Sequence, residues 1–170
     1  MNPTTALLVI DIQRGLFSKP TPVYQEQRLL DIINDLVSRA HAARAQVVIV
    51  QHENDSFLAP ASDGWQLHPS LKPGEHYLSV RKHHASAFNG TDLKAELAAR
   101  GVTRVVIVGV VTQGCVKATC QDAIKLGYET VLVKDGHSSY AKDAAQLIET
   151  WNQRLASEGA NVKPAAEIEF

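Results

Sequence analysis

The chain has 170 residues, a length that favours one domain with a hydrophobic core of its own. With 45% hydrophobic residues, 21% charged residues and a formal net charge of -1, its composition excludes a disordered or fibrous protein. The basic residues are scattered, and the short RKHH cluster at 81–84 is too brief to follow a phosphate backbone, so we expect no nucleic-acid partner.

In the first half of the chain, short apolar runs alternate with a segment of helical periodicity. Residues 6–10, ALLVI, predict a buried strand, and residues 25–43 carry apolar side chains at the three- and four-residue spacing of a helix. Residues 46–52, QVVIVQH, predict a second strand. The stretch 54–74 is rich in Pro, Gly, Ser and Asp and predicts a long loop, which in a compact domain is usually functional.

The same alternation continues in the second half. Strands are predicted at 77–82, 103–111 and 128–135, and the tail at 165–170 is expected to add an edge strand. Helices are predicted from residue 91 or 92 to 100, from 112 to 127 and from 141 to 157. No internal repeat or low-complexity segment interrupts this pattern, so we assign residues 1–170 to a single domain.

Continuous Val, Ile and Leu runs that alternate with helices predict a mostly parallel sheet covered on both faces, a doubly wound, Rossmann-like α/β fold. In such sheets ligands bind beyond the carboxyl ends of the strands, near the point where the strand order reverses. Asp11 follows the first predicted strand, His52 ends the second, Lys82 ends the third and Cys115 follows the fourth. We therefore expect an acid, an imidazole, an ammonium and a thiol to meet at one edge of the sheet.

Cys115 is the candidate nucleophile. It lies in GVVTQGCVKAT, where a predicted strand turns into a predicted helix. The backbone N–H groups of that turn and a neighbouring cation are expected to lower the pKa of its thiol, and the same N–H groups could hold an oxyanion. Taken alone, Cys115 could be a small core residue, Asp11 a loop cap and Lys82 a solvated strand end. The catalytic interpretation depends on the order and spacing of all three.

Several segments carry a family resemblance over nearly the whole chain. LLVIDIQ near the start, GWQLHPSL at 64–71, SAFNGTDL at 86–93 and VVIVGVVTQGCVKATCQDAIKLGY resemble the isochorismatase-like cysteine hydrolases. Matched position by position, the resemblance implies that Asp11, Lys82 and Cys115 are the acid, the lysine and the nucleophile. It also implies a homo-oligomer, a dimer or tetramer, and often a cis peptide bond just before Val111 that turns the Val111 N–H into the oxyanion site.

The residue types predict an acyl-transfer reaction. Asp11 accepts the proton of Cys115, and Lys82 favours the ionised forms of both. The thiolate attacks a carbonyl carbon, the N–H groups of Val111 and Cys115 stabilise the oxyanion, and water hydrolyses the resulting thioester. We expect a small-molecule substrate with a C–N bond, an amide or ureide, and no cofactor.

Further side chains are candidates for the substrate pocket because they lie near predicted strand ends or in the long loop: Gln13, Phe17, His52, Trp65, His68 and Phe88. Aromatic walls with few polar anchors suit a small planar substrate. The alternative is that Phe17, Trp65 and Phe88 pack the core or a subunit interface. Asp135 is expected to fix a loop rather than to take part in chemistry.

Metal binding is not expected. Nicotinamidases, relatives within the same superfamily, resemble one another in an Asp-Trp-His cluster after the second strand, with a further His nearby, that holds a metal. This chain reads QHENDSF there, with Gln51 in place of the acid. His52, Glu53 and His68 are possible zinc ligands by type, but their spacing fits no strong pattern. The sequence therefore predicts a metal-free site.

Two other functions stay open. Isochorismatase activity, the hydrolysis of a vinyl ether, needs an acid such as Asp11 and no thiol, together with cations for two carboxylates that Arg14, Arg81 and Lys82 could supply. A redox-sensing protein would instead use an exposed Cys115 of low pKa, although Cys120 is poorly placed to form a disulfide with it.

The sequence predicts neither export nor membrane insertion. Its first residues, MNPTTALLVIDIQ, contain no basic segment, and their apolar run is too short for a signal peptide. No apolar stretch approaches about 20 residues, the length that spans a bilayer. We therefore expect a cytoplasmic protein with no membrane partner and with free thiols at both Cys115 and Cys120.

Overall fold

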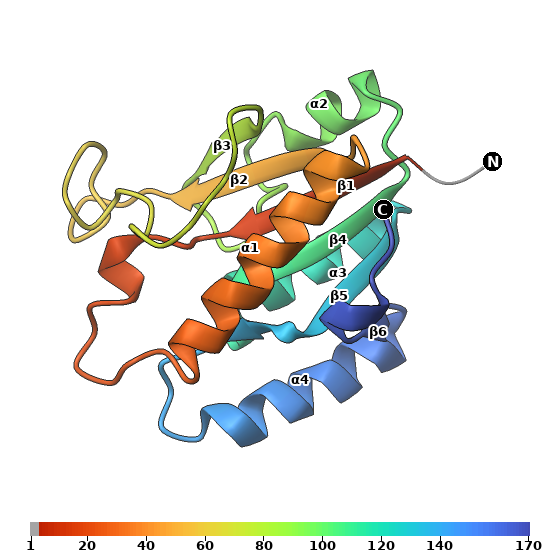
Figure 1. Cartoon of the computed structure of the whole chain (residues 1–170). Helices are drawn as coiled ribbons and strands as arrows, with labels where there is room; N and C mark the ends of the chain where they lie inside the picture. The colour runs from red at the N-terminus through yellow and green to blue at the C-terminus, as the bar shows by residue number, and fades with distance from the viewer. Residues whose placement is uncertain (1–3) are drawn as a thin grey trace.

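The computed structural model describes residues 4–170, so residues 1–3 of the predicted domain lie outside it. The described chain forms one six-stranded sheet in the order β3-β2-β1-β4-β5-β6, and every neighbouring pair is parallel (Figure 1). The strands are β1 (Thr5–Ile10), β2 (Gln46–His52), β3 (Leu78–Lys82), β4 (Arg104–Val110), β5 (Glu129–Ser138) and β6 (Asn161–Lys163). The chain starts at β1 in the middle of the sheet, moves outward to β3, and then crosses to the other side of β1 to form β4.

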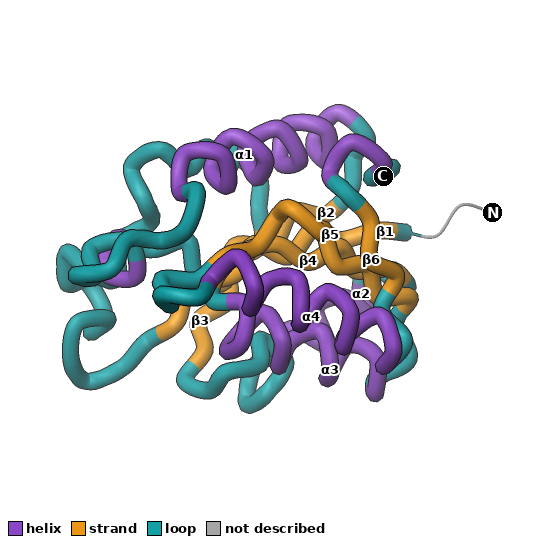
Figure 2. The backbone as a smooth tube through the Cα atoms, turned by 90° about the horizontal axis from the view of Figure 1, so that it is seen from below, coloured by secondary structure: helices purple, strands orange, loops and turns teal. Residues whose placement is uncertain are grey.

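Helices cover both faces of the sheet. The helices are α1 (Glu26–Ala42), α2 (Leu93–Ala99), α3 (Lys117–Lys125) and α4 (Ala144–Glu158). Helix α1 packs on one face, and α3 and α4 lie together on the other (Figure 2). Leu93 and Leu97 of α2 belong to the same core cluster as α3 and α4. The prediction of a doubly wound α/β fold is confirmed.

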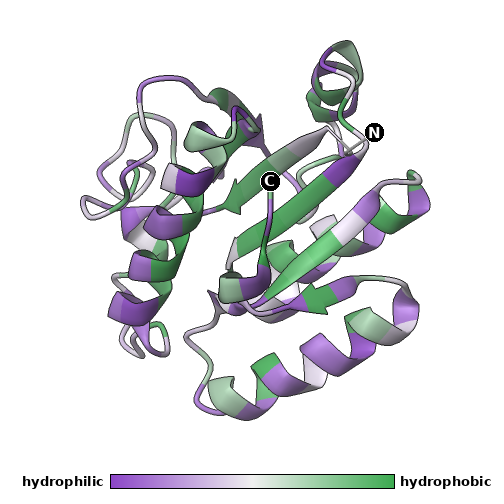
Figure 3. Cartoon of the chain, turned by 45° about the vertical axis from the view of Figure 1, so that its right-hand side comes forward, coloured by the Kyte–Doolittle hydropathy of each residue, from purple (hydrophilic) through white to green (hydrophobic). Residues whose placement is uncertain are grey.

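The continuous apolar runs follow from burial on both faces. In β1, Leu7 and Val9 pack in the cluster under α1, whereas Leu8 and Ile10 pack in the cluster under the other helices. Figure 3 shows the same green, hydrophobic colour along the central strands. Fully burying one such side chain contributes about 1.5–3 kcal/mol. A strand that buries both faces therefore has apolar residues at successive positions and no alternation of polar and apolar side chains.

Three predicted boundaries are wrong. Strand β5 extends to Ser138, three residues beyond the predicted end at 135, because His137 and Ser138 continue to pair with β4 after an irregularity in the register. The edge strand is Asn161–Lys163 and not the tail, since Ala165–Glu167 forms a short 3-10 helix after Pro164. The helix predicted at 112–127 begins with an irregular π turn at Thr112–Val116 before α3.

The long loop between β2 and β3 has no helix or strand of its own, but it is anchored. Leu67 forms an isolated antiparallel bridge with Gln13, the residue two positions after Asp11. The backbone N–H of His68 also donates to the carbonyl of Ile12 at 2.8 Å. The loop therefore lies against the segment that leaves β1. Among residues 4–170, no helix is long and apolar enough to cross a membrane.

Candidate active site

Three strand ends bring the predicted triad together. Asp11 follows β1, Lys82 is the last residue of β3, and Cys115 lies in the turn after β4. Asp11 takes a left-handed backbone conformation, φ 55, and its N–H donates to the carbonyl of Val50 in β2 at 3.0 Å. Because β1 lies between β2 and β4 in the sheet, the side chains that follow these strands meet beyond the same edge.

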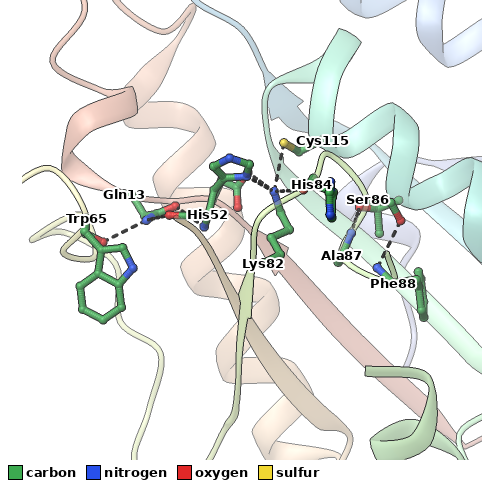
Figure 4. Close-up of polar contacts among 11 residues, drawn as sticks. Gln13, His52, Trp65, Lys82, His84, Ser86, Ala87, Phe88 and Cys115 are labelled. Carbon is green, nitrogen blue, oxygen red and sulfur yellow. Dashed lines mark hydrogen bonds and ion pairs between the residues drawn. The ribbon is translucent and has the colours of Figure 1, made fainter. Parts of the chain in front are cut away.

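The Lys82 ammonium is the centre of the cluster (Figure 4). Its Nζ lies 3.1 Å from Asp11 Oδ2, 3.2 Å from Cys115 Sγ, 2.8 Å from His52 Nδ1 and 3.1 Å from the carbonyl oxygen of His84. The side chain of Lys82 is fully buried, and Asp11 is 1% exposed. An ammonium has three protons for these four acceptors. At most three of these four atoms can therefore accept a proton of Lys82 at the same time.

Burial sets the proton affinities of the acid and the thiol. It raises the pKa of Asp11, an effect that the nearby Lys82 ammonium opposes. Burial, and then the charge of Asp11, raise the pKa of Cys115 to about 12, although Lys82 again acts in the opposite direction. The expectation of a lowered pKa for Cys115 is therefore wrong, because desolvation and the carboxylate outweigh the ammonium. The resting thiol is neutral.

One oxygen of the acid has no partner among residues 4–170. Asp11 Oδ2 contacts Lys82, but the buried Oδ1 makes no hydrogen bond within this described part of the chain. A buried acceptor without a partner is costly unless a proton or a ligand reaches it. The Asp11 carboxylate, His52 and Cys115 have side-chain atoms within 4.8 Å of one another. Asp11 Oδ1 is thus a free acceptor on a carboxylate that lies close to the thiol.

His52 contacts the triad more closely than the sequence indicated. Its Nδ1 accepts a hydrogen bond from Lys82, and burial and the Lys82 charge lower the pKa of the ring. The neutral ring therefore carries its proton on Nε2. His52 is half-buried, so it joins the half-buried side chain of Cys115 at the accessible side of the cluster.

The turn that carries Cys115 is tightly built. The peptide bond between Val110 and Val111 is cis, as the family resemblance implied. The carbonyl of Val111 accepts hydrogen bonds from the N–H groups of Gly114 at 3.0 Å and Val116 at 3.3 Å. Gly114 has φ -116 and ψ -108, and a Cβ there would lie 3.0 Å from the Val111 side chain. A glycine fits this close approach, and the turn presents Cys115 at the edge of the sheet.

The sequence missed two buried residues behind this turn, His137 and Asn152. His137 is 3% exposed and Asn152 is 4% exposed, and the imidazole of His137 contacts the hydroxyl of Thr112. Burial lowers the pKa of His137 to about 4, so the ring is neutral at pH 7. Neither residue was a candidate from the sequence, because their contact joins a strand to a helix 15 residues further along the chain.

The predicted pocket residues separate into different environments. Gln13 is fully buried and holds the backbone: its amide donates to the carbonyls of His52 and Trp65, both at 3.0 Å, and accepts from the His52 N–H at 2.9 Å. Among the described residues, none is a hydrogen-bond partner of the buried Nε1 of Trp65. These contacts attach the long loop to the end of β2, beside His52.

The other aromatic candidates pack against rings. Phe17 and His68 form an edge-on pair with centroids 4.9 Å apart, and His68 Nε2 contacts Glu26 at 3.1 Å. Phe88 stacks on Tyr128 at 5.6 Å. Both phenylalanines also pack against the core clusters. Packing, the alternative to a pocket wall, accounts for these contacts. Asp135 accepts a hydrogen bond from the N–H of Ala165 at 2.8 Å, as expected for a loop-fixing residue.

The zinc ligands considered from sequence do not meet one another. His68 contacts Glu26, and Glu53 contacts Arg81 and His83. A different set, Asp11, His52 and Cys115, has ligand atoms close enough for a metal ion, but the Lys82 ammonium contacts all three. These residues do not fit a metal well, because a second cation would have to displace Lys82 or share its partners. The metal-free site stays a prediction.

Comparison with known proteins identifies relatives of the whole chain. Residues 5–162 match the model of the isochorismatase domain. A streptothricin hydrolase of Streptomyces noursei is 36% identical over 97% of this chain, and this chain spans only 61% of the length of that relative. A maleamate amidohydrolase of Pseudomonas putida is 30% identical over 76% of this chain and 70% of its own. The crystal structure of an isochorismatase family protein superposes with a TM-score of 0.88 and 31% identity over 94% of this chain and 97% of that one.

Proposed function

This chain belongs to the isochorismatase family of hydrolases, and from that premise we propose that it hydrolyses a C–N bond of a small amide or ureide through a thioester on Cys115. The observation that carries the proposal is the contact of one buried ammonium, Lys82, with both Asp11 and the sulfur of Cys115. A thiol held beside an acid and a cation is suited to nucleophilic catalysis. The similarity to a maleamate amidohydrolase supports an amide as the substrate class.

The raised pKa values of Cys115 and Asp11 determine how the reaction starts. Because the resting thiol is neutral, the proton moves from Cys115 Sγ to Asp11 Oδ1 as the sulfur attacks the carbonyl carbon. The Lys82 ammonium stabilises the thiolate while it forms. The N–H groups of Val111 and Cys115 are proposed to receive the oxyanion. Asp11 then gives the proton to the leaving nitrogen, an amine or ammonia departs, and water activated by Asp11 hydrolyses the thioester.

Vinyl-ether hydrolysis is the less favoured alternative. Its substrate would need cations for two carboxylates, and the three named from sequence already have acidic partners. Arg14 contacts Asp63 at 3.1 Å, Arg81 contacts Glu53, and Lys82 contacts Asp11. A redox sensor is also less favoured, because the raised pKa of Cys115 disfavours the reactive thiolate and Cys120 is fully buried. Cytoplasmic location and a homo-oligomeric state stay predictions.

The test uses intact-mass spectrometry and ammonia release. Wild type, Cys115→Ala and Asp11→Asn are incubated with a panel of small amides and ureides and with isochorismate. We expect a mass adduct on Cys115 and ammonia from wild type only, with the fold of both variants retained by circular dichroism. Cys120→Ala is the matched control, since it removes the other thiol and should retain turnover. Pyruvate formed from isochorismate by both wild type and Cys115→Ala would instead establish vinyl-ether hydrolysis.

A further inference from the structure

A second buried polar chain lies behind the nucleophile turn, and its proton positions can be assigned. Asn152 of α4 donates from Nδ2 to the backbone carbonyl of Lys134 at 3.1 Å. A carbonyl only accepts, so the orientation of the Asn152 amide is fixed and its Oδ1 faces His137 Nε2 at 2.8 Å. His137 must therefore donate from Nε2.

The same reasoning fixes the hydroxyl of Thr112. The buried ring of His137 is neutral, because burial lowers its pKa to about 4. With its single proton on Nε2, its Nδ1 can only accept. Thr112 Oγ1 lies 2.8 Å from that nitrogen and must donate to it. The hydroxyl of a threonine that is fully buried is thus held in one direction by a chain that ends on the backbone of β5.

The hydrogen-bonded chain of Thr112, His137 and Asn152 connects the start of the turn to β5 and α4. Thr112 is the residue after Val111 and three before Cys115, His137 lies in the extension of β5, and Asn152 lies in the middle of α4. In the sheet, His137 pairs with Gly109 and Ser138 pairs with Val110, so β5 runs alongside the last residues of β4 up to the turn. A shift of His137 would therefore be transmitted to the backbone on both sides of Val111.

We propose that His137 and Asn152 are positioning residues that act through Thr112 to hold the backbone N–H groups of Val111 and Cys115 in the geometry that receives an oxyanion. The proposal rests on the acyl-transfer function proposed above, because only a tetrahedral intermediate needs that geometry. The charged cluster of Asp11 and Lys82 lies beside the sulfur, whereas this neutral chain lies behind the turn. The two can therefore be perturbed separately.

Two reactions of Cys115 distinguish this role from a merely structural one. p-Nitrophenyl acetate acetylates a thiol through a tetrahedral intermediate: the sulfur bonds to the carbonyl carbon, the thiol proton passes to Asp11, and p-nitrophenolate leaves with the bonding electrons. Iodoacetamide alkylates the same sulfur: a carbon–sulfur bond forms, iodide leaves with the bonding electrons, the thiol proton passes to Asp11, and no oxyanion forms. The ratio of the two rates reports the oxyanion site, and mass spectrometry locates both products on Cys115 rather than on Cys120.

The variants remove one hydrogen bond at a time. Thr112→Val deletes the donor hydroxyl, and Thr112→Ser retains it. At position 137, Asn retains an acceptor near Nδ1 for Thr112 but loses the donor to Asn152, whereas Gln retains that donor and loses the acceptor. Thr130→Val is the matched control, because it deletes a different buried hydroxyl, in β5, that bonds only the carbonyl of Tyr128 among the hydrogen bonds described.

We expect Thr112→Val and His137→Gln to slow acetylation about ten- to a hundredfold while alkylation changes less than about twofold. Thr112→Ser and His137→Asn should retain more of the acetylation rate, and Thr130→Val should match wild type. Unchanged acetylation in both Thr112→Val and His137→Gln would overturn the proposal, as would a parallel fall in both reactions. If wild type is alkylated but never acetylated, the acyl-transfer function itself fails.

Discussion

Two buried polar clusters lie on opposite sides of the Cys115 turn, and they are stabilised in opposite ways. The cluster of Asp11, Lys82 and Cys115 contains an ion pair, and Asp11 Oδ1 has no hydrogen-bond partner in the described part of the chain. The chain of Thr112, His137 and Asn152 is neutral, and each member has a partner of fixed direction. The charged cluster is also the more accessible of the two, because the Cys115 side chain is only half-buried whereas Thr112, His137 and Asn152 are buried.

The comparison separates reactivity from position. A buried ion pair contributes little net stability, because the interaction must first offset the desolvation of both charges. A neutral chain with every hydrogen bond satisfied avoids that cost and fixes geometry. We infer that the charged cluster supplies proton and nucleophile, while the neutral chain defines where the turn lies. Changes to each should therefore differ in size and in pH dependence.

The largest expected effect is that of Lys82→Met, which removes the cation and nearly preserves the length of the side chain. Asp11 would be left buried without its counterion, so we expect a loss of about 3–5 kcal/mol in the free energy of unfolding. The pKa of Asp11 should rise further, because the interaction that opposes its desolvation disappears. Urea unfolding of wild type and variant at pH 7 measures the loss.

Lys125→Met, at an exposed position near the end of α3, is the control for deletion of one positive charge. Its expected effect is below about 0.5 kcal/mol. If Lys82→Met were no more costly than Lys125→Met, the ion pair with Asp11 would not be a major interaction of the folded state. The Asp11–Lys82 ion pair could then no longer be the feature that distinguishes the charged cluster from the neutral one.

The neutral cluster predicts an acid-dependent loss of stability. Burial lowers the folded-state pKa of His137 to about 4, below the ordinary value of 6.5, so unfolding takes up a proton between these values. The contribution of the neutral ring is therefore complete above about pH 6.5 and is lost as pH falls through about 4. It amounts to up to about 3 kcal/mol. His52 shifts in the same direction and adds to the slope.

The contribution of His137 is isolated by comparing unfolding free energies at several pH values between 7 and 4 in wild type and in His137→Asn. The variant should show a shallower fall. His76→Gln, which removes an exposed histidine, should retain the wild-type slope. Equal slopes in wild type and His137→Asn would mean that the ring is not held neutral, and the assigned proton positions would be wrong.

The layered fold could be predicted because burial on both faces is written into continuous apolar runs. The apolar runs do not indicate where a strand ends when its pairing with a neighbouring strand is irregular. The strand was predicted to end at Asp135, but β5 continues through Gly136 to Ser138. In the structure a Cβ at Gly136 would lie 2.8 Å from Val133, so the glycine permits a close approach that lets the strand continue.

The meeting of Asp11, Lys82 and Cys115 could be predicted from the ends of strands, whereas the residues around them could not. Asp11, Lys82 and Cys115 each follow or end an apolar run, and the sheet brings such positions together. The pKa of Cys115 was predicted in the wrong direction, because desolvation depends on packing that one sequence does not reveal. His137 and Asn152 are 15 residues apart, and their pairing depends on how α4 crosses β5.

The smallest expected effect concerns Gln13, a neutral side chain next to the charged cluster. Its amide makes three hydrogen bonds to the backbones of His52 and Trp65, whereas Gln51 makes one, to the same Trp65 carbonyl at 3.0 Å. Because buried groups left without partners are costly, Gln13→Leu should lose about 2–3 kcal/mol and Gln51→Leu about 1 kcal/mol in urea unfolding. Gln13→Leu should also slow acetylation of Cys115 by p-nitrophenyl acetate, since His52 would no longer be held against Lys82. Equal losses in the two variants would show that Gln13 does not anchor the end of β2. The hydrogen-bonded chain of Thr112, His137 and Asn152 would then be the neutral group that positions the site, without a contribution from Gln13.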